Sequence, residues 1–282
     1  MTRLSSIRRG RGRWNVNLTM NISESYCQLD NVSFFLRESV QFENRPTIVF
    51  LHDSLGCVQL WRYFPEKLCT ALKCNMLIYD RQGYGKSSSL PTHHRTKDYL
   101  VKEADVLHHL LSELGRKNVI LFGHSDGGSI ALIAAGKYPS MVSALVVEAA
   151  HVFVEEVTLQ GIRAAAREYA NTNLRMRLEK YHAEKTETVF KAWTETWLSD
   201  DFRSWNIEHF LPRITCPLLF IQGAEDEYGT SKQMEAVSEL VKGKVKTVLI
   251  PGVHHTPHKE AGMKVMEEVV AFLNSTPSVS SA

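Results

Sequence analysis

The sequence predicts an α/β fold: a mostly parallel sheet of about eight strands with helices on both faces and an inserted helical cap. Three observations predict it. Short apolar runs alternate with segments of helical periodicity along most of the chain. These runs are apolar throughout, which is typical of strands buried on both faces of a parallel sheet. One block, residues 152–211, breaks the alternation because it contains only helical patterns.

The elements follow in order along the chain. The pattern predicts one or two edge strands within 26–39, then strands at 47–51, 76–79, 119–122, 144–147, 217–221 and 245–250. It predicts helices at 58–72, 99–114, 127–138, 231–241 and 259–273, and further helices at 162–181 and 186–198 inside the block. We therefore expect a core formed by residues 21–151 and 212–276. Residues 152–211 would form a cap over the carboxyl ends of the strands, where open α/β sheets place their sites.

Length and composition limit the class of protein. The 282 residues, 44% of them hydrophobic, are enough for one full core. A formal net charge of +2 gives no indication of nucleic acid or an anionic membrane as a partner. The five cysteines form no C-x-x-C pair, and no apolar run approaches the roughly 20 residues of a membrane span. We expect a cytoplasmic protein without a membrane span; the sequence does not indicate its oligomeric state.

Residues 1–20 differ from the rest, with five arginines among Ser and Gly and no acidic residue before Glu24. They lack the apolar region of a secretory signal. We expect a disordered basic tail. An organellar transit peptide, or an over-long translation start ahead of Met20, would have a similar composition.

One stretch carries the chemistry: Gly-His-Ser-Asp-Gly-Gly at residues 123–128, between a predicted strand and a predicted helix. Gly123 and Gly127 flank Ser125 two residues away on each side. Small residues are required there, because so sharp a turn brings the neighbouring backbone into contact. The motif alone is weak, and its assignment depends on an acid and a base elsewhere in the chain.

An acid and a base occur in the expected places. A serine hydroxyl needs a base to accept its proton and a third group to orient that base. Asp226 follows the strand at 217–221, and His255 follows the strand at 245–250. Both therefore lie at the edge of the sheet where Ser125 lies. From position alone, Glu225 or Glu227 could replace the aspartate, and His254 or His258 could replace the histidine.

Together these motifs resemble the α/β-hydrolase fold superfamily over about residues 26–275. The resemblance implies the chain order Ser, acid, His, with the acid three residues past Gly223. It implies His255 as base within Pro-Gly-x-Gly-His-x-Pro-His, where His254 replaces the usual Gly and His258 is structural. The segment 80–87 is similar to the family's Asp-x-x-Gly-x-Gly-x-Ser loop, to which we assign a structural role.

The resemblance also implies two backbone N–H donors for an oxyanion. One is Asp126, directly after the nucleophile. The other is Ser54, in the loop where the family usually has His-Gly-x. This chain has Asp53 in place of that Gly, which puts a carboxylate near the mouth of the site. A turn residue bonding its own backbone is the alternative role for Asp53.

Segments 125–128, 131–135 and 211–217 look like the valacyclovir-hydrolase-like (biphenyl-hydrolase-like) branch. That branch hydrolyses amino-acid esters, which implies an acidic residue holding an ammonium group. Four residues could do this: Asp53, Asp126, Glu148 and Glu155.

The sequence thus predicts a serine hydrolase with helical cap that cleaves a small carboxylic ester or acyl substrate without a cofactor. Candidates for substrate binding are Asp53, His151, Phe153, Trp193 and Trp197, although packing between cap and core is an alternative role for the aromatic residues. A thioesterase, lactonase or carbon–carbon bond hydrolase could use the same triad. A non-catalytic ligand-binding protein of the same fold is an alternative of another class.

No metal site or nucleotide cofactor is predicted. The glycines match neither a phosphate-binding loop nor a dinucleotide fingerprint. The adjacent pairs His93-His94 and His108-His109 cannot face one site on a helix, so we expect them to be solvated.

Overall fold

The computed structural model describes residues 20–276. The expected disordered tail, apart from Met20, lies outside these residues. Over the described range an eight-stranded sheet has the order β1-β2-β4-β3-β5-β6-β7-β8. The strands are β1 (Ser23–Leu29), β2 (Val32–Ser39), β3 (Thr47–Leu51), β4 (Asn75–Tyr79), β5 (Val119–His124), β6 (Val142–Glu148), β7 (Leu218–Gly223) and β8 (Val245–Ile250). β2 pairs antiparallel with β1 and β4, and the other pairings are parallel, which confirms the predicted fold class.

The apolar runs account for the middle of the sheet. Every residue of β3, β4 and β5 is buried, as expected for strands covered on both faces. The two edge strands, β1 and β8, consist almost entirely of exposed and half-buried positions. The continuous apolar strands therefore lie next to one another at the centre, where the sheet carries the site.

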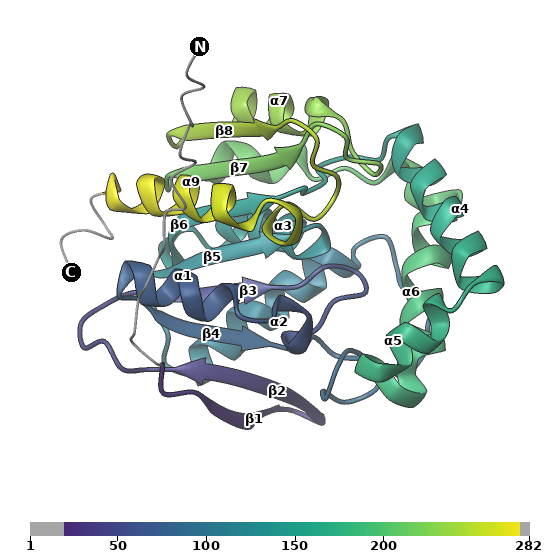
Figure 1. Ribbon diagram of the computed structural model, residues 1–282, viewed down its shortest axis with the longest axis horizontal. Helices are drawn as coiled ribbons and strands as arrows, with labels where there is room; N and C mark the ends of the chain where they lie inside the picture. The colour runs from purple at the N-terminus through teal and green to yellow at the C-terminus, as the bar shows by residue number, and fades with distance from the viewer. Residues whose placement is uncertain (1–19, 277–282) are drawn as a thin grey trace, which may run out of the picture.

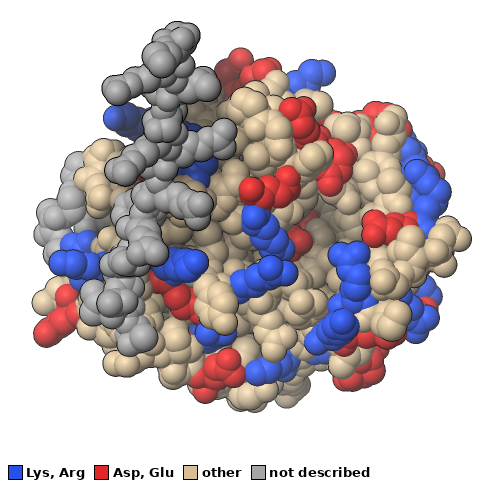
Figure 2. Space-filling model, viewed as in Figure 1, with Lys and Arg blue, Asp and Glu red and all other residues tan. Residues whose placement is uncertain are grey.

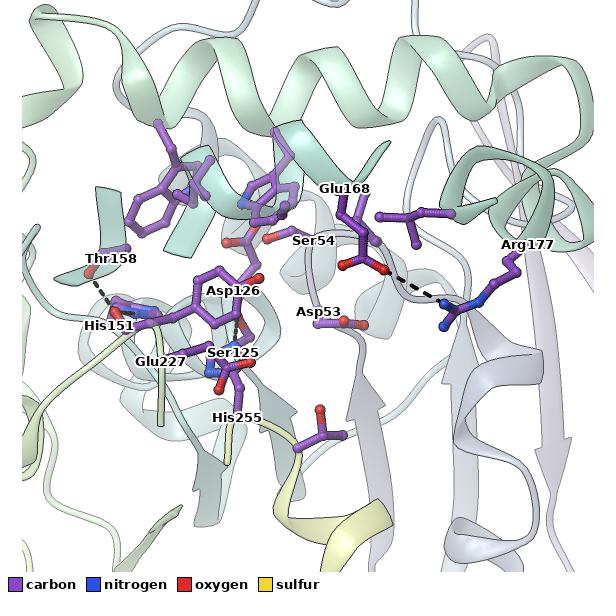
Figure 3. Close-up of a pocket in the computed structure, with 18 residues that line it drawn as sticks. Asp53, Ser54, Ser125, Asp126, His151, Thr158, Glu168, Arg177, Glu227 and His255 are labelled. Carbon is purple, nitrogen blue, oxygen red and sulfur yellow. Dashed lines mark hydrogen bonds and ion pairs between the residues drawn. The ribbon is translucent and has the colours of Figure 1, made fainter. Parts of the chain in front are cut away.

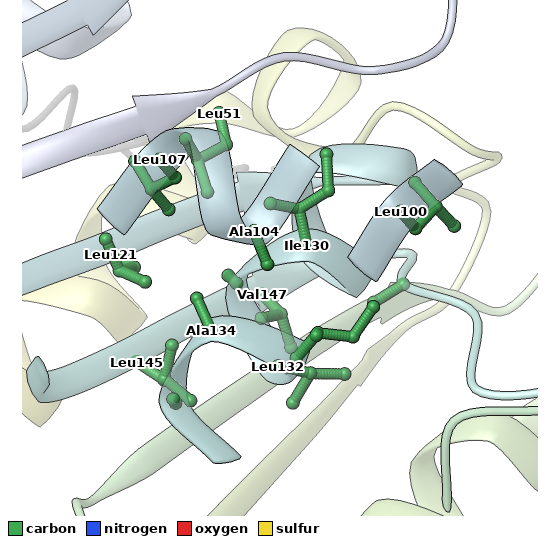
Figure 4. Close-up of a cluster of buried hydrophobic side chains, with 14 of the residues drawn as sticks. Leu51, Leu100, Ala104, Leu107, Leu121, Ile130, Leu132, Ala134, Leu145 and Val147 are labelled. Atoms are coloured by element: carbon green, nitrogen blue, oxygen red, sulfur yellow. The ribbon is translucent and has the colours of Figure 1, made fainter. Parts of the chain in front are cut away.

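Helices cover both faces (Figure 1). One layer contains α1 (Phe64–Leu72) and α9 (Gly262–Asn274), which share a hydrophobic cluster with alternate residues of the strands. The other contains α2 (Tyr99–Glu113), α3 (Asp126–Lys137) and α7 (Ser231–Leu240). Figure 4 shows how Leu107 of α2 and Ile130 of α3 approach Leu51 and Leu121 of the strands in this second cluster. Since both faces are covered, the carboxyl ends of the strands are left as the place for a site.

An all-helical segment follows β6 and covers those ends (Figure 1). It contains α4 (Glu156–Asn171), α5 (Leu174–His182) and α6 (Thr186–Leu198), with the short 3₁₀ turns η3 (Ala183–Lys185), η4 (Asp201–Ser204) and η5 (Glu208–Arg213). No strand lies in this segment of the described chain, and one isolated bridge joins Phe153 to Asn206. The arrangement agrees with the expected cap; the boundaries at 152 and 211 stay a prediction.

The segment is attached to the core at one end by buried polar contacts. The Lys185 ammonium donates to the carbonyls of Gly85 and Ser87 at 2.7 and 2.6 Å. His182 Nε2 donates to the Leu55 carbonyl at 2.9 Å, and its Nδ1 accepts from the Gly85 N–H at 3.1 Å. These bonds hold the end of α5 on the loops that follow β3 and β4.

Two predicted helices are interrupted. The helix expected at 58–72 is a 3₁₀ turn, η1 (Val58–Trp61), followed by α1, and the chain bends at Arg62, whose φ is 53°. Pro65 lies in the first turn of α1, where a backbone N–H would have no partner within the helix. Its missing N–H therefore costs no hydrogen bond there, and a new helix can begin. The helix expected at 259–273 is likewise two pieces, α8 (Pro257–Glu260) and α9, joined at Ala261. The apolar spacing continues through both breaks, which is why periodicity alone missed them.

Figure 2 shows basic and acidic side chains interspersed on one face of the molecule, without a field of a single sign. Within residues 20–276, no helix combines the length and the apolar character needed to cross a membrane.

Candidate active site

The turn between β5 and α3 holds Ser125 in a strained conformation. Its φ is 54° and its ψ is −120°, outside the regions that L-residues usually occupy. The two glycines make the turn possible. A Cβ at Gly123 would lie 2.2 Å from the Gly127 carbonyl oxygen, and a Cβ at Gly127 would lie 2.0 Å from that of Leu51. The sharp turn predicted from the motif is confirmed, together with the reason for both glycines.

Three side chains from different loops meet at this turn. The Ser125 hydroxyl donates to His255 Nε2 at 2.9 Å, and His255 Nδ1 donates to Asp226 Oδ1 at 2.8 Å. Asp226 lies in the loop after β7 and His255 in the loop after β8. Burial lowers the pKa of His255, but the neighbouring Asp226 carboxylate outweighs burial and holds this pKa above its usual value. The geometry is that of a nucleophile, a base and an orienting acid.

The competing residues lie elsewhere. His254 is exposed, and its Nδ1 lies 3.1 Å from Glu260. His258 is buried behind the site, with Nδ1 2.6 Å from Glu148. Glu225 accepts from the Gly252 N–H at 3.2 Å. Of the alternatives left open by the sequence, only Glu227 lines the same cavity as Ser125, and it is Asp226 that accepts the hydrogen bond from His255.

The loop after β3 lies beside the turn and brings Asp53 and Ser54 to the cavity. Arg81 holds this loop, since its guanidinium donates to the Asp53 carbonyl at 2.8 Å. The first turn of a helix leaves backbone N–H groups without intrahelical acceptors, which applies to Asp126 at the start of α3. The two predicted oxyanion donors therefore come from loops on adjacent strands, and their role stays a prediction.

The adjoining loop at 80–87 is held internally. Asp80 Oδ1 accepts from the Val58 N–H at 2.6 Å, and its Oδ2 accepts from the Lys86 N–H at 2.8 Å. Ser87 donates to the Asp80 carbonyl at 2.6 Å. These bonds agree with the structural role expected for this loop.

A cavity of about 340 Å³ opens above Ser125, between the core and the helical segment (Figure 3). Four of the predicted substrate-binding residues line it: Asp53, His151, Trp193 and Trp197. Phe153 is not among the residues that line it, and its role in substrate binding stays a prediction. Its side chain packs against the hydrophobic core while its backbone bridges to Asn206, because the chain leaves the sheet at this point.

Only some of the candidate carboxylates reach this cavity. Asp53 and Asp126 line it, whereas Glu148 is fully buried against His258 and Glu155 accepts from Thr230 and Gln233. Burial raises the pKa of Asp53, but His124, Lys259 and other basic groups outweigh it and bring this pKa to about 2. The Asp53 carboxylate is therefore charged at neutral pH.

Sequence reasoning missed several residues of the wall. The helical segment contributes Thr158, Ile162, Ala165, Glu168, Leu174 and Arg177. Tyr228 also lines the cavity, and its ring centroid is 4.6 Å from that of His255. Its position two residues after Asp226, in a loop already assigned to the site, was the signal that could have found it. The residues of α4 and α5 gave no such signal, because which face of each helix lines the cavity depends on how the helical segment packs on the core.

His93 and His94 are half-buried and exposed, as expected, but the reason given for this does not apply to them. His93 and His94 lie in the loop that joins β4 and α2, not on a helix, and their ring centroids are 4.1 Å apart. His93 Nε2 lies 3.1 Å from Glu195 Oε2 on α6. The argument that adjacent side chains diverge holds for a helix and does not apply to this loop.

Comparisons with known proteins agree with this fold. Residues 46–208, more than half of the chain, match the family described as alpha/beta hydrolase fold. The protein named serine hydrolase BPHL of Homo sapiens is 30% identical over 190 residues, which cover 64% of this chain and 63% of that protein. Its counterpart in Mus musculus is 30% identical over 191 residues, with the same shares. The chain thus matches less than two thirds of the length of these relatives.

Solved structures are similar as well. The enol-lactonase from Burkholderia xenovorans LB400 has a TM-score of 0.71 and 16% identity, over 89% of this chain and 100% of that chain. The proline iminopeptidase of Mycobacterium smegmatis has a TM-score of 0.70 and 18% identity, over 92% and 100%. At such identities the likeness concerns the fold alone. With the family match over residues 46–208, it leads to one conclusion: this chain belongs to the α/β-hydrolase fold family.

Proposed function

We propose that this protein is a serine hydrolase that cleaves a small carboxylic ester through an acyl-enzyme, with no cofactor. The observation that carries the proposal is the continuous hydrogen-bonded series from Ser125 through His255 to Asp226, at 2.9 and 2.8 Å, facing a cavity. The human relative's name, serine hydrolase, supports the same class of reaction.

The first half-reaction is acylation. Ser125 Oγ attacks the carbonyl carbon of the ester while His255 Nε2 accepts its proton. The carbonyl oxygen becomes an oxyanion, and the N–H groups of Ser54 and Asp126 stabilise it; such a donor contributes roughly 3 kcal/mol. His255 then gives the proton to the leaving alkoxide. The carbon–oxygen bond breaks, the alcohol departs, and an ester to Ser125 remains.

The second half-reaction reverses these roles with water. His255 accepts a proton from a water molecule, whose oxygen attacks the acyl carbon of the Ser125 ester. The tetrahedral species collapses, and Ser125 recovers its proton from His255. The products are a carboxylic acid and an alcohol, and the protein returns to its starting state.

A fluorophosphonate probe tests the nucleophile directly, because such probes label an activated serine. We expect the folded protein to be labelled at Ser125 and to hydrolyse p-nitrophenyl acetate. Ser125→Ala should lose labelling and turnover. The control is Ser129→Ala, one helical turn further along α3, which removes a buried hydroxyl that bonds to the His151 carbonyl; it should keep both. Absence of labelling in folded wild-type protein would rule out the enzyme and favour a ligand-binding protein of the same fold.

We further propose that the preferred ester carries an ammonium group. Four carboxylates line the cavity, those of Asp53, Asp126, Glu168 and Glu227, against the single guanidinium of Arg177. The resemblance to the valacyclovir-hydrolase-like branch, which hydrolyses amino-acid esters, supports the same substrate class. An acidic wall attracts a cationic substrate and disfavours an anionic one.

Asp53 is the carboxylate best suited to this ammonium. Asp126 Oδ2 already accepts from the Tyr99 hydroxyl at 2.9 Å and lies 3.9 Å from Arg81, so much of its charge is compensated. Glu168 forms an ion pair with Arg177 at 3.8 Å (Figure 3). Asp53 lies in the loop next to the proposed oxyanion donor, where a charge on the α-carbon of an amino-acid ester would be close to it.

A pair of substrates tests Asp53. Wild type should prefer phenylalanine ethyl ester over its N-acetyl derivative. In Asp53→Asn, KM for the amino ester should rise roughly tenfold or more, while the neutral N-acetyl ester should be affected little. Asp200→Asn, which removes an exposed carboxylate, should change neither. Equal losses on both substrates would mean that Asp53 shapes the loop and does not bind the ammonium.

A further inference from the structure

A group of metal-binding side chains lies outside the catalytic site, at the outer junction of core and cap. His93 and His94 come from the loop between β4 and α2, and Glu195 comes from α6. Their ligand atoms all lie within 4.8 Å of one another, and His93 Nε2 is 3.1 Å from Glu195 Oε2. The three residues are half-buried or exposed, so an ion can reach them from solvent.

The donor set identifies the class of ion. Two imidazoles and one carboxylate suit zinc and similar divalent transition metals, whereas Mg²⁺ and Ca²⁺ favour sites made of oxygen ligands. Zinc bonds to nitrogen and oxygen of about 2.0–2.2 Å would bring the three ligand atoms closer together than 4.8 Å. The exposed side chains can make that adjustment by rotation, and water would complete the coordination.

We propose that His93, His94 and Glu195 bind one divalent transition-metal ion of the zinc class, and that this ion links cap helix α6 to the core. Without the ion, a solvent-accessible His–Glu pair of this kind stabilises the protein little. With it, two residues of the core loop and one of the cap share a single centre, so the link is stronger and depends on the metal.

The metal site lies on the same helix, α6, as two residues that line the cavity. Trp193 and Trp197, two residues to either side of Glu195 on α6, line the cavity, and Trp197 Nε1 donates to the Tyr99 hydroxyl at 2.9 Å. An ion at Glu195 would hold α6 from its solvent side while this bond holds it from the inside. The ion takes no part in the proposed ester hydrolysis.

Cobalt binding tests the site without any measure of catalysis. The full chain should bind one Co²⁺ with visible d–d absorption and release it to Zn²⁺. Glu195→Gln and the double variant His93→Ala/His94→Ala should each weaken Co²⁺ binding roughly ten- to a hundredfold or more. The matched control is His108→Ala/His109→Ala, which removes the other adjacent histidine pair, on α2, and should bind Co²⁺ as wild type does.

Two results would rule out the site: no saturable Co²⁺ signal, or Co²⁺ binding weakened as much by the control variant as by the site variants. Unchanged Co²⁺ binding in Glu195→Gln would also overturn the proposal, because the ion would then have no ligand on the cap. Zn²⁺ should also raise the Tm of wild type and of the control variant but not that of Glu195→Gln. Circular dichroism of each variant without metal checks its folding. Fluorophosphonate labelling of Ser125 in the presence of Zn²⁺ should be unchanged, which separates this site from metal binding at His255.

Discussion

At the scale of single residues, the proposed mechanism makes activity depend on the proton affinity of His255. Burial lowers its pKa and Asp226 raises it, with a net rise above the usual value near 6.5. Only the neutral imidazole can accept the Ser125 proton. The acidic limb of the profile of kcat/KM against pH should therefore lie above pH 6.5 and fall as His255 becomes protonated.

Asp226→Asn tests this balance. Removing the carboxylate takes away the main influence that raises the His255 pKa, so the acidic limb should move to lower pH. The orientation of the imidazole is lost as well, and kcat should fall by roughly 10⁴. The measurement is a pH profile of kcat/KM on an activated ester. In Glu225→Gln, where the neighbouring acid is removed, the limb should stay in place; if it moved in this variant and not in Asp226→Asn, the acid would be misassigned.

Some residues of the candidate site could be predicted from the sequence and others could not. Ser125, Asp226 and His255 could be proposed because each lies in the turn or loop after a strand that is easy to recognise in the sequence. Asp53 was identified as a departure from a family pattern, and its place in the cavity follows from the end of β3. Phe153 packs against the core and does not line the cavity. This could not be predicted, because no local pattern in the sequence says which way a side chain points where the chain leaves a sheet.

At the scale of elements, the β5–α3 turn depends on backbone contacts that leave no space for a side chain. A Cβ at Gly127 would clash with the carbonyl end of β3, and a Cβ at Gly123 would clash with the start of α3. Leu51 and Gly123 are paired in the sheet, so these contacts join adjacent strands. The turn is therefore set by the sheet as well as by its own sequence.

Gly127→Ala should accordingly destabilise the protein. The added Cβ would lie 2.0 Å from the Leu51 carbonyl oxygen, and the backbone must move to relieve the clash. The free energy of unfolding from urea denaturation should fall by about 1–3 kcal/mol, with loss of Ser125 labelling. The control is Gly262→Ala at the start of α9, where no atom lies within 4 Å of the new Cβ. A Gly127→Ala protein as stable and as readily labelled as wild type would contradict the close approach.

Strands could be predicted from the sequence better than helix breaks. The runs at 47–51 and 245–250 were found with the bounds that the structure has, since apolar and β-branched content marks a strand clearly, whether it is buried like β3 or at the edge like β8. The breaks at Arg62 and Ala261 were missed because the apolar positions on both sides of each break still cover the same cluster.

At the scale of the whole molecule, the helical segment is joined firmly to the core at the end of α5. The Lys185 ammonium is buried there, and burial lowers its pKa. Its bonds to the Gly85 and Ser87 carbonyls compensate for part of that burial. This docking determines which face of each helix lines the cavity. No local sequence pattern contains that information, so the cavity residues of α4 and α5 could not be predicted.

Lys185→Met tests the docking. Methionine keeps a long side chain but leaves the carbonyls without a donor, so the free energy of unfolding should fall by about 1.5–3 kcal/mol. KM for esters should rise, since α4 to α6 form much of the cavity wall. Lys232→Met, which changes an exposed lysine at the start of α7, should alter neither quantity. Equal stability of the two variants would mean that apolar packing alone attaches the cap.

The contact between Gly127 and the end of β3 has one more consequence, for motion. Ser125 and the loop that carries Ser54 are fixed to two neighbouring strands that touch at this point. We therefore expect the Ser125 hydroxyl and the loop that carries Ser54 to move together when the sheet deforms, so that the distance between them is preserved. Warming should therefore disturb the docked cap before it misaligns the reacting groups, so that selectivity among substrates is lost at a lower temperature than the ability to react with a fluorophosphonate.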